Sequence, residues 1–502
     1  MKLSPIQKEI VSTVGNLIVR ASAGTGKTHT MVNKIVKEVQ DNSNHKVIAA
    51  ITFTIKAAQE IKDRLVVDIS QHFIGTNNSF VIEEVIKPFM KDVYGEAFDL
   101  YMNTDYSVKI NYFEEGIKKI ANDATLCSYE DNNKNFIFEL AQKIVENSSA
   151  CRLYLQAKYF KIYVDEYQDC DKDMHKFFMY LCDQLKIETF VVGDEKQSIY
   201  IWRGAYPEAF KSIWRKENFK KIFMGDNFRS CQQIQNYSNL LFEETRHLYT
   251  PIKSLENIVW LSTTSSAWPV EVVKHIDPIQ KSALLRFSNV NAKNGASFLS
   301  EKGMDYVYIP QTPIAEITTE TAWLYSAIAK YIILEQYSVY DLISEIPAEG
   351  EASKKTVSSI KKHINNIETS LQTEDIDLFE IQVKNLADYL GYLIRRDHVE
   401  RLFQTISETV FHVAFEPEKY RHIAITFHSS KGLEFDQVIV FAEDYRLSDM
   451  ASIYNHYVAV TRAKTKLIIV KLNDYNANLF QRNLTSILAD SNLKLENMVS
   501  LS

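Results

Sequence analysis

The chain has 502 residues, of which 46% are hydrophobic and 24% charged. This composition is that of an ordinary folded protein and excludes wholesale disorder. At about 150 residues per domain, the length predicts roughly three or four structural units. The formal net charge of −7 excludes a protein that coats nucleic acid through positive charge alone, so any nucleic-acid contact has to be local.

The cysteines and the apolar runs indicate the compartment. The cysteines are five in number and scattered, without a Cys-x-x-Cys pair, and they are Cys127, Cys151, Cys170, Cys182 and Cys231. We expect reduced thiols rather than a zinc site or a redox centre. The first ten residues lack a signal-type apolar core, and no run approaches the roughly 18 apolar residues of a membrane span. The sequence therefore predicts a cytoplasmic protein without a membrane partner.

The first informative stretch surrounds a lysine in a glycine-containing loop. Apolar residues 17–19 predict a buried strand, and periodic residues 28–39 predict a helix. Between them the sequence reads Ala21, Ser22, Ala23, Gly24, Thr25, Gly26, Lys27 and Thr28. A strand, a glycine turn ending in Gly-Lys-Thr and a helix are typical of a nucleotide-phosphate cradle. A plain strand-to-helix turn is the alternative, which these two flanking elements disfavour.

Each residue type in this loop has a chemical reason. Gly24 and Gly26 let backbone N–H groups turn toward an anion, Lys27 supplies a cation for the phosphates, and the Thr28 hydroxyl is suited to ligate Mg²⁺. Position 21 is alanine where the usual pattern has glycine, which is a mild departure. Upstream, the Gln7 amide is suited to read an adenine edge, although a surface glutamine remains an equal alternative.

The next segments predict a parallel sheet with an insertion. Residues 46–53 read as a second strand that turns into a helix at residues 52–61, and this repeat is typical of a parallel α/β sheet. Phe53 and Thr54 follow that strand, where open sheets bind ligands. A core role for Phe53 is about as well supported. Residues 65–160 show helical periodicity and many aromatic residues, which predicts a mainly helical insertion.

Two further strands end in polar motifs. Residues 161–164 precede Asp165 and Glu166, a carboxylate pair that is costly to bury without a cation. We expect Asp165 to hold Mg²⁺ and Glu166 to polarise the attacking water. An acidic helix N-terminus is the weaker alternative. Residues 189–192 precede Gln197, which is placed to sense a phosphate or the attacking water.

The same stretch continues with residues that are suited to meet a ligand beyond the sheet, namely Tyr200, Trp202 and Arg203. Trp202 is the best candidate in the chain for stacking on a base. A half-buried structural tryptophan is the local alternative.

Taken in order, these segments resemble the UvrD/Rep class of superfamily-one DNA helicases. The signature comprises residues 21–28, 51–54, 165–169 and 193–205, and it continues with Asp226-Asn-Phe-Arg-Ser230, with residues 425–435 and with residues 457–463. The resemblance spans nearly the whole chain. It implies an α/β fold with two RecA-like parallel-sheet domains, ATP between them, and a mainly helical insertion in each.

The expected division of the chain follows from this resemblance. The first RecA-like domain comprises residues 1–75 and 158–224, and its insertion residues 76–157. The second comprises residues 225–311 and 419–502, and its insertion residues 312–418. In the second half we expect strands at 282–287, 304–309 and 466–470, helices at 321–336 and 379–395, and a flexible break at 346–353. Little chain follows the strand 466–470, so we expect any nuclease to come from a partner.

The resemblance also implies roles for single residues. Gln7 reads adenine, Phe228 stacks on it, Glu434 contacts the ribose, and Gln197, Arg229 and Arg462 reach the γ-phosphate. His29 stands where the family commonly has arginine over the adenine. A single-strand path is formed by Phe53, Thr54, Tyr200, Trp202, Arg203, Thr426 and His428.

The sequence thus predicts an ATP-dependent DNA helicase or translocase that uses Mg²⁺ and moves 3′ to 5′ on single-stranded DNA. Its compact motif set is similar to that of the helicase-like subunit of the Gabija antiphage system, which works beside a nuclease subunit. Two alternatives stay open. One is a regulatory subunit that senses DNA ends or nucleotide state with little unwinding, and the other is a stand-alone DNA repair helicase.

Overall fold

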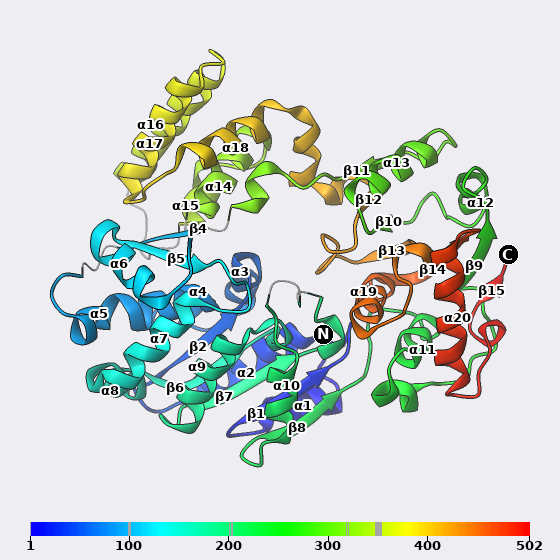
Figure 1. Ribbon diagram of the computed structural model, residues 1–502, viewed down its shortest axis with the longest axis horizontal. Coiled ribbons are helices and arrows are strands. Elements are labelled where there is room, and N and C mark those ends of the chain that lie inside the picture. The colour runs from blue at the N-terminus through cyan, green and yellow to red at the C-terminus, as the bar shows by residue number, and fades with distance from the viewer. Residues whose placement is uncertain are drawn as a thin grey trace.

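The structure is a computed structural model, which describes residues 2–98, 102–199, 201, 204–317, 319, 321–346 and 354–502. Within these residues two large β-sheets form the frame, with strand orders β3-β2-β6-β7-β1-β8 and β11-β12-β10-β13-β14-β9-β15. Figure 1 shows the first sheet in the lower part of the molecule and the second at the right. The expected α/β class is confirmed.

The first sheet holds the phosphate loop. Its strands are β1 (Leu17–Ala21), β2 (Val47–Thr52), β3 (Phe73–Thr76), β6 (Tyr159–Val164), β7 (Glu188–Gly193) and β8 (Lys220–Met224). Every described pairing among them is parallel. The carboxyl ends of these strands therefore lie along one edge, where open α/β sheets bind ligands.

Helices cover both faces of this sheet. They are α1 (Pro5–Ser12), α2 (Lys27–Asp41), α3 (Ile55–Arg64), α9 (Lys172–Asp183) and α10 (Glu208–Arg215). On one face Met31 of α2 packs with Val19 and Tyr163. On the other, Phe177 of α9 and Phe210 of α10 belong to the main core. These hydrophobic contacts hold the strand ends in fixed positions.

The first insertion contains more β-structure than its sequence suggested. Its helices are α4 (Asn77–Val81), α5 (Lys87–Tyr94), α6 (Phe113–Asp123), α7 (Phe136–Asn147) and α8 (Ser149–Lys158). The prediction of helices missed β4 (Asn103–Ile110) and β5 (Thr125–Tyr129), which pair in parallel. In β4 the apolar residues Tyr106, Val108 and Ile110 alternate with polar ones, and so short a period of two carries little signal within a helical stretch.

The second sheet is also parallel in every described pairing. Its strands are β9 (Ile258–Thr263), β10 (Ser282–Arg286), β11 (Tyr306–Tyr308), β12 (His422–Thr426), β13 (Phe435–Phe441), β14 (Ala463–Leu472) and β15 (Ser500–Leu501). Its helices are α11 (Gln232–Leu240), α12 (Trp268–Val273), α13 (Asn289–Ser300), α19 (Met450–Val460) and α20 (Tyr475–Ala489). The strand predicted at 466–470 lies within β14, and the short strand β15, which the sequence did not predict, follows it and pairs with β9.

The second insertion is helical and has its own core. Its helices are α14 (Ala322–Ile333), α15 (Val339–Ser344), α16 (Lys354–Leu371), α17 (Ile376–Leu390) and α18 (Arg396–Ser407). The helix predicted at 379–395 ends at Leu390, because Gly391 adopts φ +80° and terminates it. Most of the break predicted at 346–353 lies outside the described residues.

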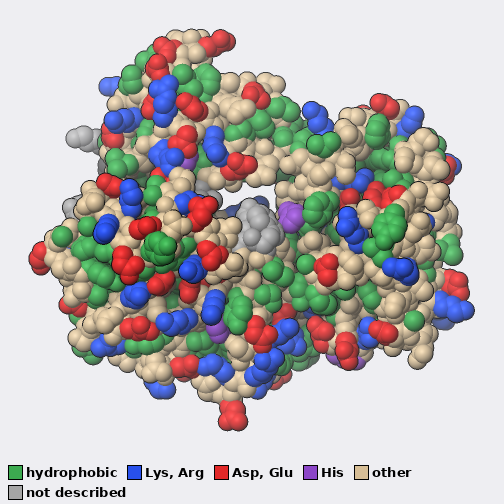
Figure 2. All heavy atoms as spheres, in the orientation of Figure 1, with side chains coloured by type: hydrophobic (Ala, Val, Ile, Leu, Met, Phe, Trp, Pro, Cys, Tyr) green, Lys and Arg blue, Asp and Glu red, His purple; other side chains and the backbone are tan. Residues whose placement is uncertain are grey.

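The two insertions touch each other. Arg395, just before α18, donates hydrogen bonds to Asp105 and Ser107 of β4. In Figure 1 the helices α14–α18 form an arch above the two sheets, and Figure 2 shows an opening beneath that arch. Among the described helices, none is both long and apolar enough to cross a membrane.

Candidate functional site

The phosphate loop connects β1 to the first turn of α2. Gly24 and Gly26 have φ angles of +74° and +79°, a left-handed conformation that glycine adopts without strain. A Cβ atom on Gly24 would also overlap the Asn227 side chain. Lys27 begins α2, so its backbone N–H belongs to the helix N-terminus, which favours anions. The loop therefore has the backbone conformation that a phosphate cradle needs.

Gln7 lies against this loop. Its side chain Nε2 donates to the Thr25 carbonyl at 3.1 Å, and its Oε1 accepts from the Ser4 N–H at 2.9 Å. Only 4% of Gln7 is exposed. Both ends of the amide thus hold backbone groups, and Gln7 ties α1 to the loop. His29 lies in the first turn of α2, where the Asn33 amide donates to its carbonyl at 2.8 Å.

The two adjacent carboxylates follow β6 and face the loop lysine. Lys27 Nζ lies 3.5 Å from Glu166 Oε1. Asp165 is 3% exposed, and burial together with the charge of Glu166 raises its pKa. Although burial opposes it, the charges of Lys27 and Lys431 hold the pKa of Glu166 below its usual range. The nearby lysines thus favour the ionised form of Glu166, whereas burial and Glu166 disfavour the ionised form of Asp165.

The segment after β8 brings residues of the second half to the loop. The Phe228 N–H donates to the Gly24 carbonyl at 2.9 Å, while 54% of Phe228 is exposed. Arg229 forms an ion pair with Glu434 at 2.5 Å. Phe228 and Arg229 therefore lie beside the phosphate loop, and Glu434 is paired with Arg229. All three are predicted nucleotide-site residues.

Arg462 approaches the same place from the second sheet. It is 2% exposed, and its Nη2 donates to Gln197 Oε1 at 3.4 Å. Burial, and then the nearby charge of Arg229, lowers the pKa of Arg462 to about 10. The guanidinium stays charged at neutral pH all the same. Two cationic groups from the second half thus lie close to each other and to the loop of the first half.

A buried network completes the contact between the halves. Asp194, fully buried after β7, accepts at Oδ2 from Gln197 Nε2 at 2.8 Å and from the Tyr457 hydroxyl at 3.2 Å. The Ala23 N–H donates to the same Tyr457 hydroxyl at 3.1 Å. Lys196 Nζ lies 3.1 Å from Asp194 Oδ1 and donates to Ser22 at 3.1 Å. Carboxylate and lysine thereby fix the loop.

Sequence reasoning missed these roles. Asp194, Lys196 and Tyr457 lie inside quoted motifs, yet nothing in their local spacing indicates that they meet. The same holds for Lys431, whose Nζ pairs with Asp169 of the first half at 2.6 Å. A lysine or aspartate inside a strand-end motif is the signal that could have found these contacts, because such charges are almost always paired when they are buried.

The predicted nucleic-acid residues that the structure describes lie at strand ends. Half-buried Phe53 packs on the core, and exposed Thr54 accepts the Ala57 N–H at 3.1 Å and so caps α3. At the end of β12, the Thr426 hydroxyl pairs with Ser429 at 2.9 Å. The half-buried His428 lies beside Phe427, with the two ring planes inclined at 37°. Tyr200, Trp202 and Arg203 lie outside the described residues.

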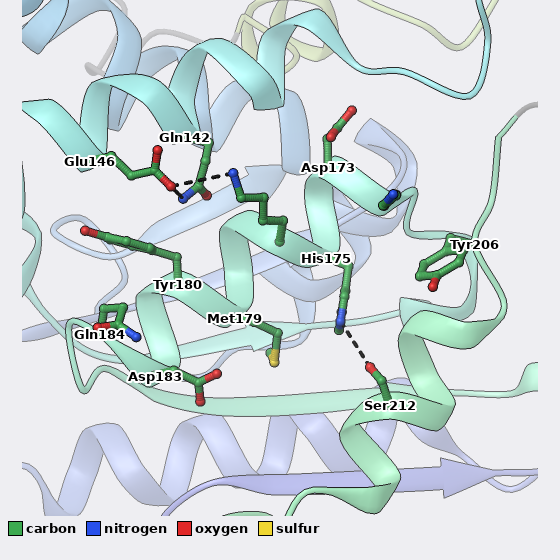
Figure 3. Close-up of a pocket in the computed structure, with 12 residues that line it drawn as sticks. Gln142, Glu146, Asp173, His175, Met179, Tyr180, Asp183, Gln184, Tyr206 and Ser212 are labelled. Atoms are coloured by element: carbon green, nitrogen blue, oxygen red, sulfur yellow. Dashed lines mark hydrogen bonds and ion pairs between the residues drawn. The ribbon is translucent and has the colours of Figure 1, made fainter.

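A separate pocket of about 440 Å³ lies among α7, α9 and α10 and contains no predicted site residue. Figure 3 shows His175 of α9 directed toward Ser212 of α10, with 3.0 Å between Nε2 and the hydroxyl. His175 Nδ1 lies 3.0 Å from the Tyr167 hydroxyl. Burial and then Lys216 lower the pKa of His175 to about 4. This neutral histidine therefore joins three elements behind the acidic motif.

The fold and the residues gathered at the phosphate loop define the class of protein. A phosphate loop and an acidic pair on one parallel sheet, approached by Arg229 from the segment after β8 and by Arg462 from the segment before β14, are the elements of a phosphoryl-transfer ATPase. Known sequences agree. The profile of the AAA domain matches residues 7–203, and that of the UvrD-like helicase C-terminal domain matches residues 422–470.

Whole proteins are similar as well. Gabija protein GajB of Bacillus cereus (strain VD045) is 38% identical over 489 residues, covering 95% of this chain and 97% of the relative. ATP-dependent DNA helicase Rep of Buchnera aphidicola subsp. Acyrthosiphon pisum is 23% identical, covering 93% and 94%. Rep of Escherichia coli (strain K12) is 25% identical and covers 50% of this chain and 44% of its own. The chain belongs to the GajB family of UvrD-like helicases, and it is an ATP-hydrolysing enzyme of that class.

Proposed function

We propose that the chain is a Mg²⁺-dependent ATPase motor that moves 3′ to 5′ along single-stranded DNA. The observation that carries this proposal is the approach of Arg462 to Gln197 at 3.4 Å, because it joins a charge of the second half to the phosphate side of the first. The direction of movement rests on the likeness to UvrD and Rep.

The proposal divides the chain into two RecA-like domains. Residues 1–75 and 158–224 form the first, and residues 225–311 and 419–502 the second. The insertions are residues 76–157 and 312–418. The two parallel sheets and the separate core of α14–α18 support this division. ATP would lie between the sheets, with the phosphates at the loop of residues 21–28.

The residues present fit Mg²⁺. The Thr28 hydroxyl and the Asp165 carboxylate are oxygen donors of the kind that this hard cation prefers. Burial and the charge of Glu166 raise the pKa of Asp165, and a cation bound beside it would favour its ionised form. When bound, Mg²⁺ would neutralise charge on the phosphate oxygens. Glu166, kept ionised beside Lys27, then orients and deprotonates the attacking water.

The second half would complete the site. Arg229 and Arg462 stabilise negative charge that develops on the γ-phosphate, a role worth about 10³ to 10⁵ in rate. Gln197, which Arg462 contacts, links that phosphate to the Asp194 network. Phe228, exposed beside Gly24, would stack on adenine, with His29 and Gln7 near it. Hydrolysis would thus depend on closure of the cleft.

The same closure would drive movement on DNA. Thr54 follows β2 and Thr426 ends β12, so the proposed path runs over the carboxyl ends of both sheets. Phe53, His428, Tyr200, Trp202 and Arg203 would complete it. Bases stacked on such aromatic side chains hold a strand without reading its sequence. A change in the distance between the two sheets would then move the DNA contacts of one sheet along the DNA strand relative to those of the other.

We further propose that this motor works in an antiphage complex with a nuclease subunit. The 38% identity with Gabija protein GajB over 95% of the chain supports this. Native mass measurement of the untagged protein, purified together with the products of neighbouring genes, tests it. A stable complex with a second chain is the expected result. A monomer that unwinds duplex DNA alone would instead indicate a stand-alone helicase.

The motor itself is tested by ATP turnover with Mg²⁺, with and without single-stranded DNA. We expect DNA to stimulate turnover, and we expect a strand with a 3′ single-stranded tail to be displaced in preference to one with a 5′ tail. Turnover that DNA does not change would exclude a motor. It would favour a subunit that reports nucleotide state to its partner.

A further inference from the structure

The second sheet carries an exposed aromatic ring outside the helicase motifs. Phe287 directly follows β10, and 51% of its surface is exposed. Its neighbour Arg286 pairs in register with Thr426 of β12. The Phe427 N–H donates to the Arg286 carbonyl at 3.0 Å and extends this pairing. Phe287 therefore lies at the same sheet edge as Thr426 and His428, which the proposed DNA path includes.

Two rings pack beside Phe287. The fully buried ring of Phe427 has its centroid 5.6 Å away, and the ring of His428 has its centroid 6.1 Å away at an interplanar angle of 72°. These contacts lie within the range of favourable aromatic pairs. They occupy one part of the Phe287 surface and leave about half of it open to the solvent.

The backbone of Phe287 is held as firmly as its ring. Its N–H donates to Asp444 Oδ2 at 3.1 Å, and Arg286 Nε donates to the same oxygen at 2.7 Å. The Arg286 guanidinium also lies 3.7 Å from the centroid of Phe441. An exposed ring fixed in this way loses little conformational entropy when a ligand covers it, which is the physical advantage of a pre-organised contact.

Resting on the proposed function, we propose that Phe287 stacks on a base of single-stranded DNA at the second sheet, next to His428. An unpaired base offers an apolar face of matching size, and every base has one. The contact would therefore strengthen binding without sequence preference. It would give the second half an aromatic grip of its own, separate from Phe53 and Trp202 on the first half.

The test uses the full chain and a fluorescein-labelled oligothymidylate, with binding measured by fluorescence anisotropy. Phe287→Ala should raise Kd about 5- to 150-fold, the range that corresponds to the loss of one stacked base. Phe287→Trp should bind like the wild type, and Phe287→Leu, apolar but not aromatic, should bind nearly as weakly as the alanine variant. Phe298→Ala is the matched control, because Phe298 is 44% exposed on the neighbouring helix α13 and packs on Trp268 instead. Basal ATP turnover should be unchanged in all four variants.

A second ligand separates stacking from other causes. On an oligonucleotide with the same backbone but no bases, wild type and Phe287→Ala should bind with equal Kd. An alanine variant that binds oligothymidylate like the wild type overturns the inference and leaves the motor intact. An equal loss on both ligands shows a damaged backbone contact and also overturns it. A wild type that hydrolyses ATP but binds neither ligand overturns the proposed motor and the inference together.

Discussion

The proposed ATP site and the proposed DNA-facing edge of the sheets hold their residues in different ways. In the cleft, Arg462 and Asp194 are 2% and 0% exposed, and their partners come from both halves of the chain. At the edge, Phe287 is 51% exposed and Thr54 caps its own helix. Removing one partner of a buried polar group leaves the other without a hydrogen bond, which costs a large free energy. Removing an exposed contact costs only the free energy of that contact.

This difference separates the proposed site of ATP hydrolysis from the proposed DNA contacts. The residues of the proposed ATP site form one connected hydrogen-bond network, so we expect substitutions among them to have large and non-additive effects. The DNA edge consists of separate contacts, so we expect each substitution there to act weakly and nearly independently. Variants ordered by effect size therefore test whether the two regions differ as the structure indicates.

The largest effect is expected for Lys27→Ala. The substitution removes the loop cation and the 3.5 Å partner of Glu166, so ATP turnover should fall by more than about 10³-fold. Lys37→Ala is the control, because Lys37 lies on the same helix with a side chain that is 46% exposed. Turnover measured by phosphate release should be normal for the control. A Lys27 variant with near-normal turnover would mean that the cleft is not the site.

Next in size is Arg462→Lys, which keeps a positive charge but loses the planar fork of donors. We expect kcat to fall about 10³-fold while a fluorescent ATP analogue still binds with normal affinity. The exposed Arg421→Lys should be silent. If ATP binding and kcat fell together in the Arg462 variant, the residue would support the fold of the cleft rather than the reaction.

Local patterns were enough to predict most of the fold. The strand before the phosphate loop, the strand before Asp165 and the helix after Lys27 all follow from apolar runs and glycine turns. The pair β4 and β5 was missed, because short alternating stretches inside a helical region carry a weak signal. Strand β15 was missed as well, since a strand of two residues depends on its neighbour β9.

The candidate site was predictable only as far as its motifs reach. Lys27 and Glu166 stand out because their residue types and neighbours are chemically specific, whereas Arg462 was expected only from the resemblance to UvrD and Rep. The contact of Tyr457 with Asp194 and Ala23 depends on how two distant segments pack, and no spacing within either segment encodes it. The same is true of Phe287. It ends an apolar run that predicts a strand, so the sequence indicates a core residue and not an exposed one.

A moderate effect is expected at Trp202, which lies outside the described residues. Trp202→Ala should raise the DNA concentration needed for half-maximal ATPase stimulation about 5- to 150-fold and spare basal turnover, because one stacked base is lost. Trp202→Phe should restore most of the stimulation. If basal turnover falls as much as stimulated turnover, Trp202 belongs to the connected cleft instead of the edge.

The smallest effect concerns the core beneath the cleft and depends on pH. His456 is fully buried beside Tyr457, with Nε2 2.8 Å from the Tyr237 hydroxyl, and burial lowers its pKa to about 3. In the unfolded chain histidine has a pKa of about 6.5. As pH falls below about 6.5 the unfolded state binds a proton that the folded state excludes, so the stability present above that pH is lost by up to about 1.4 kcal/mol per pH unit.

Urea unfolding between pH 7.5 and 5.5, about one unit on either side of that pKa, measures this loss. The free energy of unfolding should fall less with acid for His456→Phe than for wild type, and as much as wild type for the exposed His45→Phe. Equal slopes in all three proteins would show that His456 takes up a proton in the folded state. The core around Tyr457 would then be less rigid than its contacts indicate.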